Sequence, residues 1–225
     1  ERHVATNQDQ LRRRWPFLER FVAPGKAVLE IGCSSGFMLD GFRAAGMQCT
    51  GIEPSDVFID YLRGRNYEVF SSLDELEADG TRRFDLIVHF FVLEHIADPR
   101  DFFRRQLALL KPGGTIVAEV PSATDPLTSL YTIPAFERFY WSIAHHYYYT
   151  PRALGAVLDT LGLKYRLLPE QRYDLSNHVV WMTEGKPGGQ GRFDGIFSPA
   201  LIEQYKRDLK AAWRCDTIML EVSAA

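Results

Sequence analysis

Residues 27–39, "AVLEIGCSSGFML", have types and spacing that could do chemistry, and two interpretations compete for them. As Gly-x-Ser-x-Gly, formed by Gly32, Ser34 and Gly36, the stretch would present a serine nucleophile at a sharp turn between a strand and a helix. As Glu-x-Gly-x-x-x-Gly, beginning at Glu30, it is a turn whose backbone passes close to a small molecule. A nucleophile elbow needs strands and an oxyanion loop ahead of it, and only about 30 residues of helical character precede Gly32. The second interpretation is therefore favoured.

A second acid, Glu53, ends the next apolar run about 20 residues after Gly32, where a carboxylate can accept hydrogen bonds from both hydroxyls of a ribose. The stretch departs from the dinucleotide fingerprint Gly-x-Gly-x-x-Gly, because Ser34 replaces the second glycine and Met38 and Leu39 flank the place of the third. Two acids and two glycines thus predict a nucleoside site without a diphosphate.

These residues have to be positioned by strands and helices. Residues 28–120 alternate short β-rich runs with helical periodicity, which is typical of a parallel sheet with helices on both faces. The predicted strands are 27–32, 48–53, 67–70, 84–91, 114–120, 163–169 and 216–222. The predicted helices are 36–45, 55–64, 72–78, 99–111, 151–162 and 199–213, with a short Ser-capped helix beginning at 176.

Residues 84–122, "FDLIVHFFVLEHIADPRDFFRRQLALLKPGGTIVAEVPS", join a strand, a Leu-Glu-His turn, a helix and a Leu-Lys-Pro-Gly-Gly turn. With the glycine turn and Glu53, the chain resembles the class I S-adenosylmethionine-dependent methyltransferases over roughly residues 27–169. The resemblance implies an α/β fold with a Rossmann-like, doubly wound, seven-stranded, mostly parallel sheet, an antiparallel last strand and helical, aromatic lid insertions. Within this single domain we expect a helical segment (1–25), a cofactor-binding core (26–122) and a C-terminal half of the sheet with substrate-facing lid segments (123–225).

The resemblance also implies the cofactor S-adenosyl-L-methionine, its product S-adenosyl-L-homocysteine, and no metal. The glycine turn should line the methionine part, Glu53 the ribose, and the end of the fourth strand the methyl group. Ser34 stands where the family usually has a middle glycine, and "FSSLDEL" lacks the acid that often contacts adenine. The expected cofactor-binding residues are Glu30, Gly32, Cys33, Ser34, Gly36, Glu53, Pro54, Ser72, Leu73, Phe90, Phe91 and His95.

Methyl transfer from a sulfonium is an in-line displacement, so the protein has to align donor and acceptor and remove the acceptor's proton. The candidate bases are His146 and His145 in "AHHYYYTP" and His95 just after the fourth strand, although an acceptor that is already an anion or an activated carbon would need no base. Segments 130–149 and 176–189 are expected to form a lid. The expected substrate contacts are Tyr140, Trp141, Tyr147, His178 and Trp181.

The acceptor predicted first is a hydroxyl of a sugar or glycan in bacterial polysaccharide or sugar biosynthesis, because aromatic faces with scattered histidine and asparagine suit a sugar. A quinone or a natural-product scaffold is the alternative acceptor. Two alternatives belong to other classes of protein: a catalytically silent cofactor-binding module, and a serine hydrolase that acts through Gly-Cys-Ser-Ser-Gly.

Composition narrows the partners and the compartment. A formal net charge of −3 and a pI near 6.1 do not indicate binding to nucleic acid. The short basic run 12–14 is interpreted as a solvated helix face. No apolar run approaches the roughly 18 residues that cross a bilayer, so we expect no membrane insertion and a cytoplasmic location. The three cysteines are widely spaced, which favours neither disulfides nor a zinc site. Nothing in the sequence indicates an oligomeric state.

Overall fold

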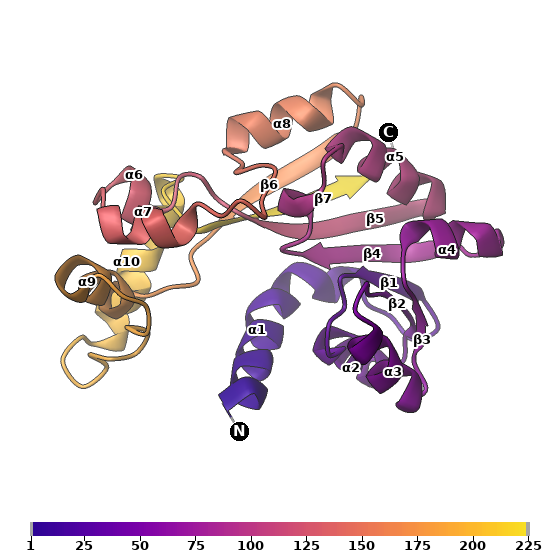
Figure 1. Cartoon of the computed structure of the whole chain (residues 1–225), viewed down its shortest axis with the longest axis horizontal. Coiled ribbons are helices and arrows are strands. Elements are labelled where there is room, and N and C mark those ends of the chain that lie inside the picture. The colour runs from indigo at the N-terminus through magenta and orange to yellow at the C-terminus, as the bar shows by residue number, and fades with distance from the viewer. Residues whose placement is uncertain (1, 224–225) are drawn as a thin grey trace.

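The computed structural model describes residues 2–223, and the side chains of residues 7–223. They build a seven-stranded sheet in the order β3-β2-β1-β4-β5-β7-β6 (Figure 1). Only β7 runs antiparallel to its neighbours, β5 and β6, while the other pairs are parallel. The strands are β1 (Ala27–Ile31), β2 (Gln48–Ile52), β3 (Glu68–Phe70), β4 (Phe84–Phe90), β5 (Leu110–Pro121), β6 (Lys164–Glu170) and β7 (Thr217–Ser223).

Several helices begin where the sequence supplies a capping side chain or a proline. Asp98, followed by Pro99, caps the helix before β5, and Thr150 and Ser198 cap two later helices. The helices are α1 (Arg2–Leu18), α2 (Phe37–Ala44), α3 (Asp56–Gly64), α4 (Leu73–Asp79), α5 (Pro99–Leu109), α6 (Pro126–Ser129), α7 (Pro134–Tyr140), α8 (Pro151–Asp159), α9 (Leu175–Glu184) and α10 (Pro199–Ala211), with 3-10 turns η1 (Glu19–Phe21) and η2 (Leu93–His95).

Apolar side chains from the helices bury both faces of the sheet. On one face α4, α5 and α8 contribute Leu76, Phe103 and Leu154 to the core. On the other face α1 and α2 contribute Leu18 and Phe42. The two groups of helices lie on opposite sides of the strands in Figure 1. This is the doubly wound, Rossmann-like architecture expected from the sequence, which is confirmed.

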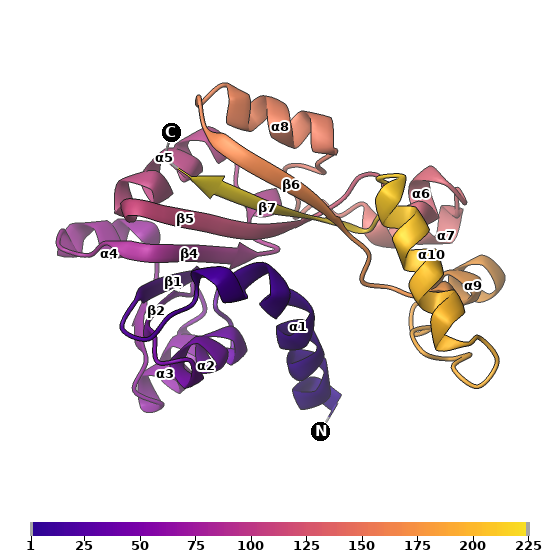
Figure 2. The same ribbon diagram turned by 180° about the vertical axis from the view of Figure 1, so that it is seen from behind.

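Four helices, α6, α7, α9 and α10, lie beyond the end of the sheet toward which β4 points (Figures 1 and 2). We call them the helical extension. Its small core is built from Leu127, Phe136 and Trp181. Because the carboxyl ends of parallel strands meet at this end of the sheet, the extension stands where open α/β sheets bind ligands.

The structure differs locally from the expectation at three places. β5 begins at Leu110, which pairs with Phe84, and the next pair is Leu86 with Thr115, so residues 111–114 form a bulge inside the strand, with Gly113 at φ +77°, where a turn was expected. α9 is capped by Asp174, whose side chain accepts from Asn177 N at 2.8 Å, and not by a serine. The sequence also missed α6 and α7, since their short runs carry too few residues to show a helical period.

None of the helices in the described part of the chain combines the length and the apolar character that a bilayer crossing requires.

Candidate functional site

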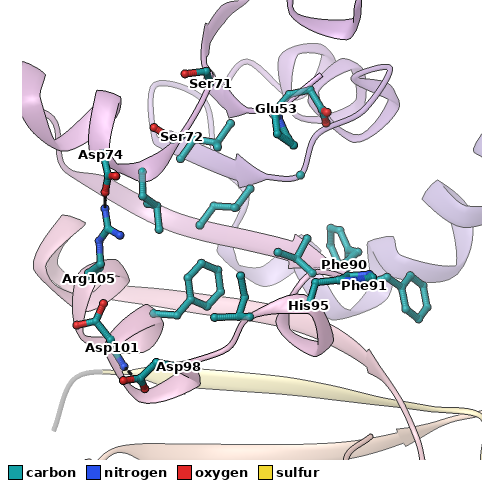
Figure 3. A pocket seen from close by; sticks show the side chains of 18 residues that line it. Glu53, Ser71, Ser72, Asp74, Phe90, Phe91, His95, Asp98, Asp101 and Arg105 are labelled. Carbon is teal, nitrogen blue, oxygen red and sulfur yellow. Dashed lines mark hydrogen bonds and ion pairs between the residues drawn. The ribbon is translucent and has the colours of Figure 1, made fainter. Parts of the chain in front are cut away.

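A cavity of about 650 Å³ opens at the carboxyl ends of β1, β2 and β4 (Figure 3). In Figure 3, Phe90 and Phe91 lie at the opposite end of the cavity from the ion pair between Asp74 and Arg105, and Glu53 lies along one side. Eight of the residues predicted to bind a cofactor line it: Gly32, Glu53, Pro54, Ser72, Leu73, Phe90, Phe91 and His95. Four others, Glu30, Cys33, Ser34 and Gly36, do not reach its surface.

The turn after β1 brings bare backbone to the cavity wall. Gly32 has φ +75°, and a Cβ there would stand 2.7 Å from Val92 Cγ2, so a side chain would be strained and crowded. Gly36 also has positive φ, at +78°, and a Cβ there would collide with Leu62. Ser34 takes a left-handed φ of 47° in the place of the family's middle glycine, at a modest conformational cost. The turn therefore keeps its shape with a serine in it.

Glu53 is held by backbone donors on both oxygens. Oε2 accepts from Ser34 N at 2.8 Å and Oε1 accepts from Ser55 N at 2.9 Å, and the residue is buried. Each carboxylate oxygen carries two lone pairs, so both oxygens can accept a further hydrogen bond from a ligand. The carboxylate faces the cavity in a fixed orientation, as a ribose clamp requires.

Glu30 lies buried behind the turn, and its Oε2 has no hydrogen-bond partner in the protein. Burial raises the pKa of this carboxyl to about 8, against the opposing effect of Arg14. An acid in this state favours a positively charged or hydrogen-bond-donating neighbour. Cys33 is buried as well, and burial raises the pKa of its thiol, so it is an inert packing residue in this structure.

His95 is the histidine that lines the cavity. Its side chain is exposed, and Nδ1 donates to the carbonyl oxygen of Ala144 at 2.9 Å, which leaves Nε2 with a free lone pair in the neutral ring. The ring of His145 packs edge-on against it, with ring centroids 4.6 Å apart. One nitrogen of each ring and one oxygen of Glu94 lie within 4.8 Å of one another, the only group of histidine, cysteine and acid side chains this close together among residues 7–223.

His146 and His178 lie elsewhere. His146 is exposed, and its backbone N–H donates to the carbonyl of Glu94 at 2.8 Å. His178 is 1% exposed, its Nδ1 is bonded to Tyr205 Oη, and burial lowers the pKa of the ring to about 4. His178 therefore belongs to the interior of the helical extension instead of a mobile lid, and does not line the cavity.

The predicted substrate-contacting aromatics are divided between surface and core. Trp141 is 47% exposed and packs against Tyr148 at 4.5 Å between centroids, while Tyr140 donates to the carbonyl of Ser122 at 2.7 Å. Tyr147 lines a separate hollow between α5 and α8. Trp181, 3% exposed, packs into the core of the extension, so its contact with a substrate stays a prediction that this burial disfavours.

A charged cluster that the sequence did not predict packs against Phe90 and Phe91 at one end of the cavity. Glu119 on β5 is fully buried and accepts from Arg13 at 2.8 Å and Arg14 at 2.9 Å. Arg14 in turn lies over Phe90, 4.1 Å from the ring centroid, and Arg172 lies 4.7 Å from that of Phe91. The interpretation of residues 12–14 as a solvated helix face was therefore wrong for Arg13 and Arg14. The sequence could not show this, because their partner Glu119 lies more than 100 residues away.

Comparison with known proteins matches these features to one family. A family model described as a methyltransferase domain matches residues 4–168. A ubiquinone biosynthesis O-methyltransferase of Xanthomonas campestris pv. campestris is 29% identical over 156 residues, which are 64% of this chain and 65% of that protein. The match thus spans less than two thirds of the length of this relative.

Solved structures share the fold. A SAM-dependent methyltransferase from Archaeoglobus fulgidus superposes with a TM-score of 0.62 at 19% identity, covering 95% of this chain and 93% of that one. Magnesium protoporphyrin IX methyltransferase from Synechocystis PCC 6803, solved with bound SAH, gives a TM-score of 0.62 at 12% identity, covering 98% and 84%. At these identities the likeness shows the fold alone.

Proposed function

The chain belongs to the class I S-adenosylmethionine-dependent methyltransferases, and from that premise we propose that it methylates a hydroxyl group on an aromatic ring of the quinone type. The observation that supports methyltransferase activity is the cavity. Its size suits the cofactor, and its glycine turn and fixed Glu53 suit a nucleoside. The name of the curated relative supports the ring hydroxyl as acceptor. A sugar or glycan hydroxyl, the acceptor predicted first from the sequence, has no support among these relatives and serves as the competing acceptor in the test below.

The residues around the cavity fit S-adenosylmethionine. The bare backbone at Gly32 and the two-sided clamp on Glu53 match a close-lying methionine chain and a ribose diol, while buried Glu30 lies behind the turn and does not line the cavity. Ser72 and Leu73 would border the adenine. When bound, S-adenosylmethionine supplies a sulfonium methyl group for in-line transfer.

The methyl end of the cavity supplies a base. We assign this role to His95, because Nδ1 is committed to Ala144 and Nε2 stays free in an exposed ring on the cavity wall. As the methyl carbon exchanges its bond to the sulfonium sulfur for one to the acceptor oxygen, with S-adenosylhomocysteine as the leaving group, Nε2 would take the hydroxyl proton, and the exposed ring would release it to water. Phe90 and Phe91 would exclude water from the transfer itself.

Replacing Glu53 with alanine should weaken S-adenosylhomocysteine binding by about 1.5–3 kcal/mol, or about 10–150-fold in Kd, because a buried charged acceptor is lost. Calorimetric titration measures this change. Glu53 has two roles to separate, binding the ribose and accepting hydrogen bonds from Ser34 N and Ser55 N. Glu53→Gln separates them in part, because its amide oxygen can still accept one of the two backbone hydrogen bonds. Exposed Asp60 on α3 provides the control Asp60→Ala, and equal binding by the Glu53 and Asp60 variants would contradict the assignment.

Two measurements in sequence test the proposed function. A thermal-shift series should show stabilisation by S-adenosylmethionine and S-adenosylhomocysteine that grows with the logarithm of concentration, by about 2.7 kcal/mol at a hundred times Kd, and little effect of NAD. Labelled methyl transfer is then measured to dihydroxylated aromatic rings and, separately, to nucleotide sugars and glycans. Turnover on the rings supports the proposal, and turnover on sugars alone would overturn the acceptor while leaving the methyltransferase in place.

A further inference from the structure

Glu94 is a buried carboxyl that the mechanism above does not use. It precedes His95 in η2, is 1% exposed, and its Oε2 has no hydrogen-bond partner in the protein. Leaving a carboxylate oxygen unpaired in the interior is costly, and such groups concentrate at functional sites. Its position one residue from the proposed base makes Glu94 a candidate for a role in methyl transfer.

His145 offers the complementary group. Its Nδ1 is buried and without a partner, and a ring nitrogen of His145 lies within 4.8 Å of a carboxylate oxygen of Glu94. An imidazole N–H donates and a carboxylate accepts, so the His145 ring can donate to the Glu94 carboxylate once the distance between the two side chains shortens. Catalytic hydrogen bonds are often long in ligand-free enzymes and tighten when the substrate is bound.

The backbone of Glu94 joins this pair to the loop that follows α7. The carbonyl oxygen of Glu94 accepts from His146 N at 2.8 Å and from Tyr147 N at 3.3 Å, and His95 Nδ1 bonds the same loop at Ala144. Three hydrogen bonds therefore fix residues 144–147 against η2. These hydrogen bonds therefore hold the side chain of His145 close to that of Glu94.

We propose that Glu94 is a positioning residue for methyl transfer, whose carboxylate accepts a hydrogen bond from His145 and stabilises the positive charge that His95 carries after taking the acceptor's proton. The proposal rests on the assignment of His95 as the base. An anion within about 4–6 Å of an imidazole favours the charged form of the ring. The proton passes from the acceptor hydroxyl to His95 Nε2 and then to water, and Glu94 gains none.

The electrostatic surroundings support this role. The pKa of Glu94 is raised to about 7, mainly by burial and to a lesser extent by Glu119, while a backbone hydrogen bond and Arg172 oppose the rise. The ionised form of Glu94 and a cation beside it stabilise each other, so the carboxylate would favour the charged ring of His95. Burial and the neighbouring His95 lower the pKa of His145, so His145 remains a neutral link between the two.

The test compares Glu94→Gln with the wild type. The amide keeps size and shape but carries no charge, so kcat should fall about 10–100-fold, while Kd for S-adenosylhomocysteine, KM for the acceptor and the melting temperature change little. Glu94→Asp restores the charge and should recover part of kcat. Adding Glu94→Gln to His145→Ala should cost little more than His145→Ala alone, because coupled residues do not add. Exposed Glu203 on α10 gives the matched control Glu203→Gln, for which all constants should be unchanged.

A second measurement needs no acceptor, so its result does not depend on whether the proposed acceptor is correct. In histidine-labelled protein with S-adenosylhomocysteine, Glu94→Gln should lower the pKa of the His145 ring by about one unit in an NMR titration, because the neighbouring anion is gone. An unchanged titration, or a loss confined to KM or stability, would overturn the proposal. So would wild-type activity that EDTA abolishes and Mg²⁺ or Zn²⁺ restores, since the three groups would then serve a cation.

Discussion

Replacing His95 with alanine should lower kcat for methyl transfer by about 10²–10⁴-fold, the contribution that a positioned base makes. The ring is exposed on the cavity wall, and its removal leaves the glycine turn and Glu53 untouched, so S-adenosylhomocysteine should still bind with at most a small loss of affinity. Steady-state kinetics and calorimetry on the same variant measure the two effects. Because the vacated position faces solvent, added imidazole should restore part of kcat in the variant and leave the wild type unchanged.

Two other histidines provide the comparison for that result. His145→Ala should also reduce kcat, but imidazole should not rescue it, since the ring is half-buried and its Nδ1 is enclosed. His146→Ala tests the competing base predicted from the sequence, and its exposed side chain leads us to expect nearly normal turnover. A loss confined to His146→Ala would transfer the role of base to that residue. Normal turnover in all three variants would mean that the acceptor reacts without a histidine.

Local spacing made much of the lining of the cavity predictable. The acid and glycines of the first turn, and Glu53 about 20 residues later, lie in two consecutive strand ends, and parallel strands bring those ends together by the rules of the fold. His95 was found in the same way, because it follows β4 directly. For such residues the sequence contains both the chemistry and the topology that positions it.

The rest of the site depends on contacts that no local pattern contains. Glu94 appears in the sequence as one letter of a Leu-Glu-His turn, and only the fold shows that its oxygen is unpartnered and lies near His145, about 50 residues later. His178 and Trp181 had the residue types of a ligand-facing lid. The packing of α9 against α7 and α10 buries both of them. Aromatic composition alone cannot separate a lid surface from the core of a small helical extension.

Replacing Glu119 with alanine should have the largest effect on stability, lowering the free energy of unfolding by about 3–5 kcal/mol, because Arg14 remains buried without its counter-charge. In a chain of this size each kcal/mol corresponds to about 2–4 °C in melting temperature, so a decrease of about 6–20 °C is expected in a thermal scan. Glu203→Ala, on an exposed face of α10, is the control and should melt like the wild type. A decrease of less than about 2 °C in Glu119→Ala would show that the cluster is not a stabilising one.

The pH dependence of that difference identifies its origin. Burial opposes ionisation of Glu119, but Arg13 and Arg14 outweigh it and lower the folded-state pKa from 4.5 to about 2. A carboxyl with a lowered folded pKa stabilises the protein fully above its unfolded pKa, and this contribution is lost as the pH falls from about 4.5 toward 2. Glu30 and Glu94, whose pKa values are raised to about 8 and about 7, act in the opposite sense and at higher pH, outside the interval in which Glu119 loses its charge. The advantage of the wild type over Glu119→Ala should thus shrink as the pH falls below about 4.5.

The same cluster ties stability to the methyl end of the cavity. Glu119 fixes Arg14, and Arg14 covers Phe90 at 4.1 Å, so α1 is fastened to β5 and β4 at the end of the cavity where we propose that donor and acceptor align. Alignment errors of about 1 Å can reduce rates about 10²-fold without abolishing binding. Glu119→Gln should therefore reduce kcat more than it weakens cofactor affinity, even at temperatures where the variant remains folded. Equal losses in both constants would place the defect in the cofactor turn and not at the methyl end.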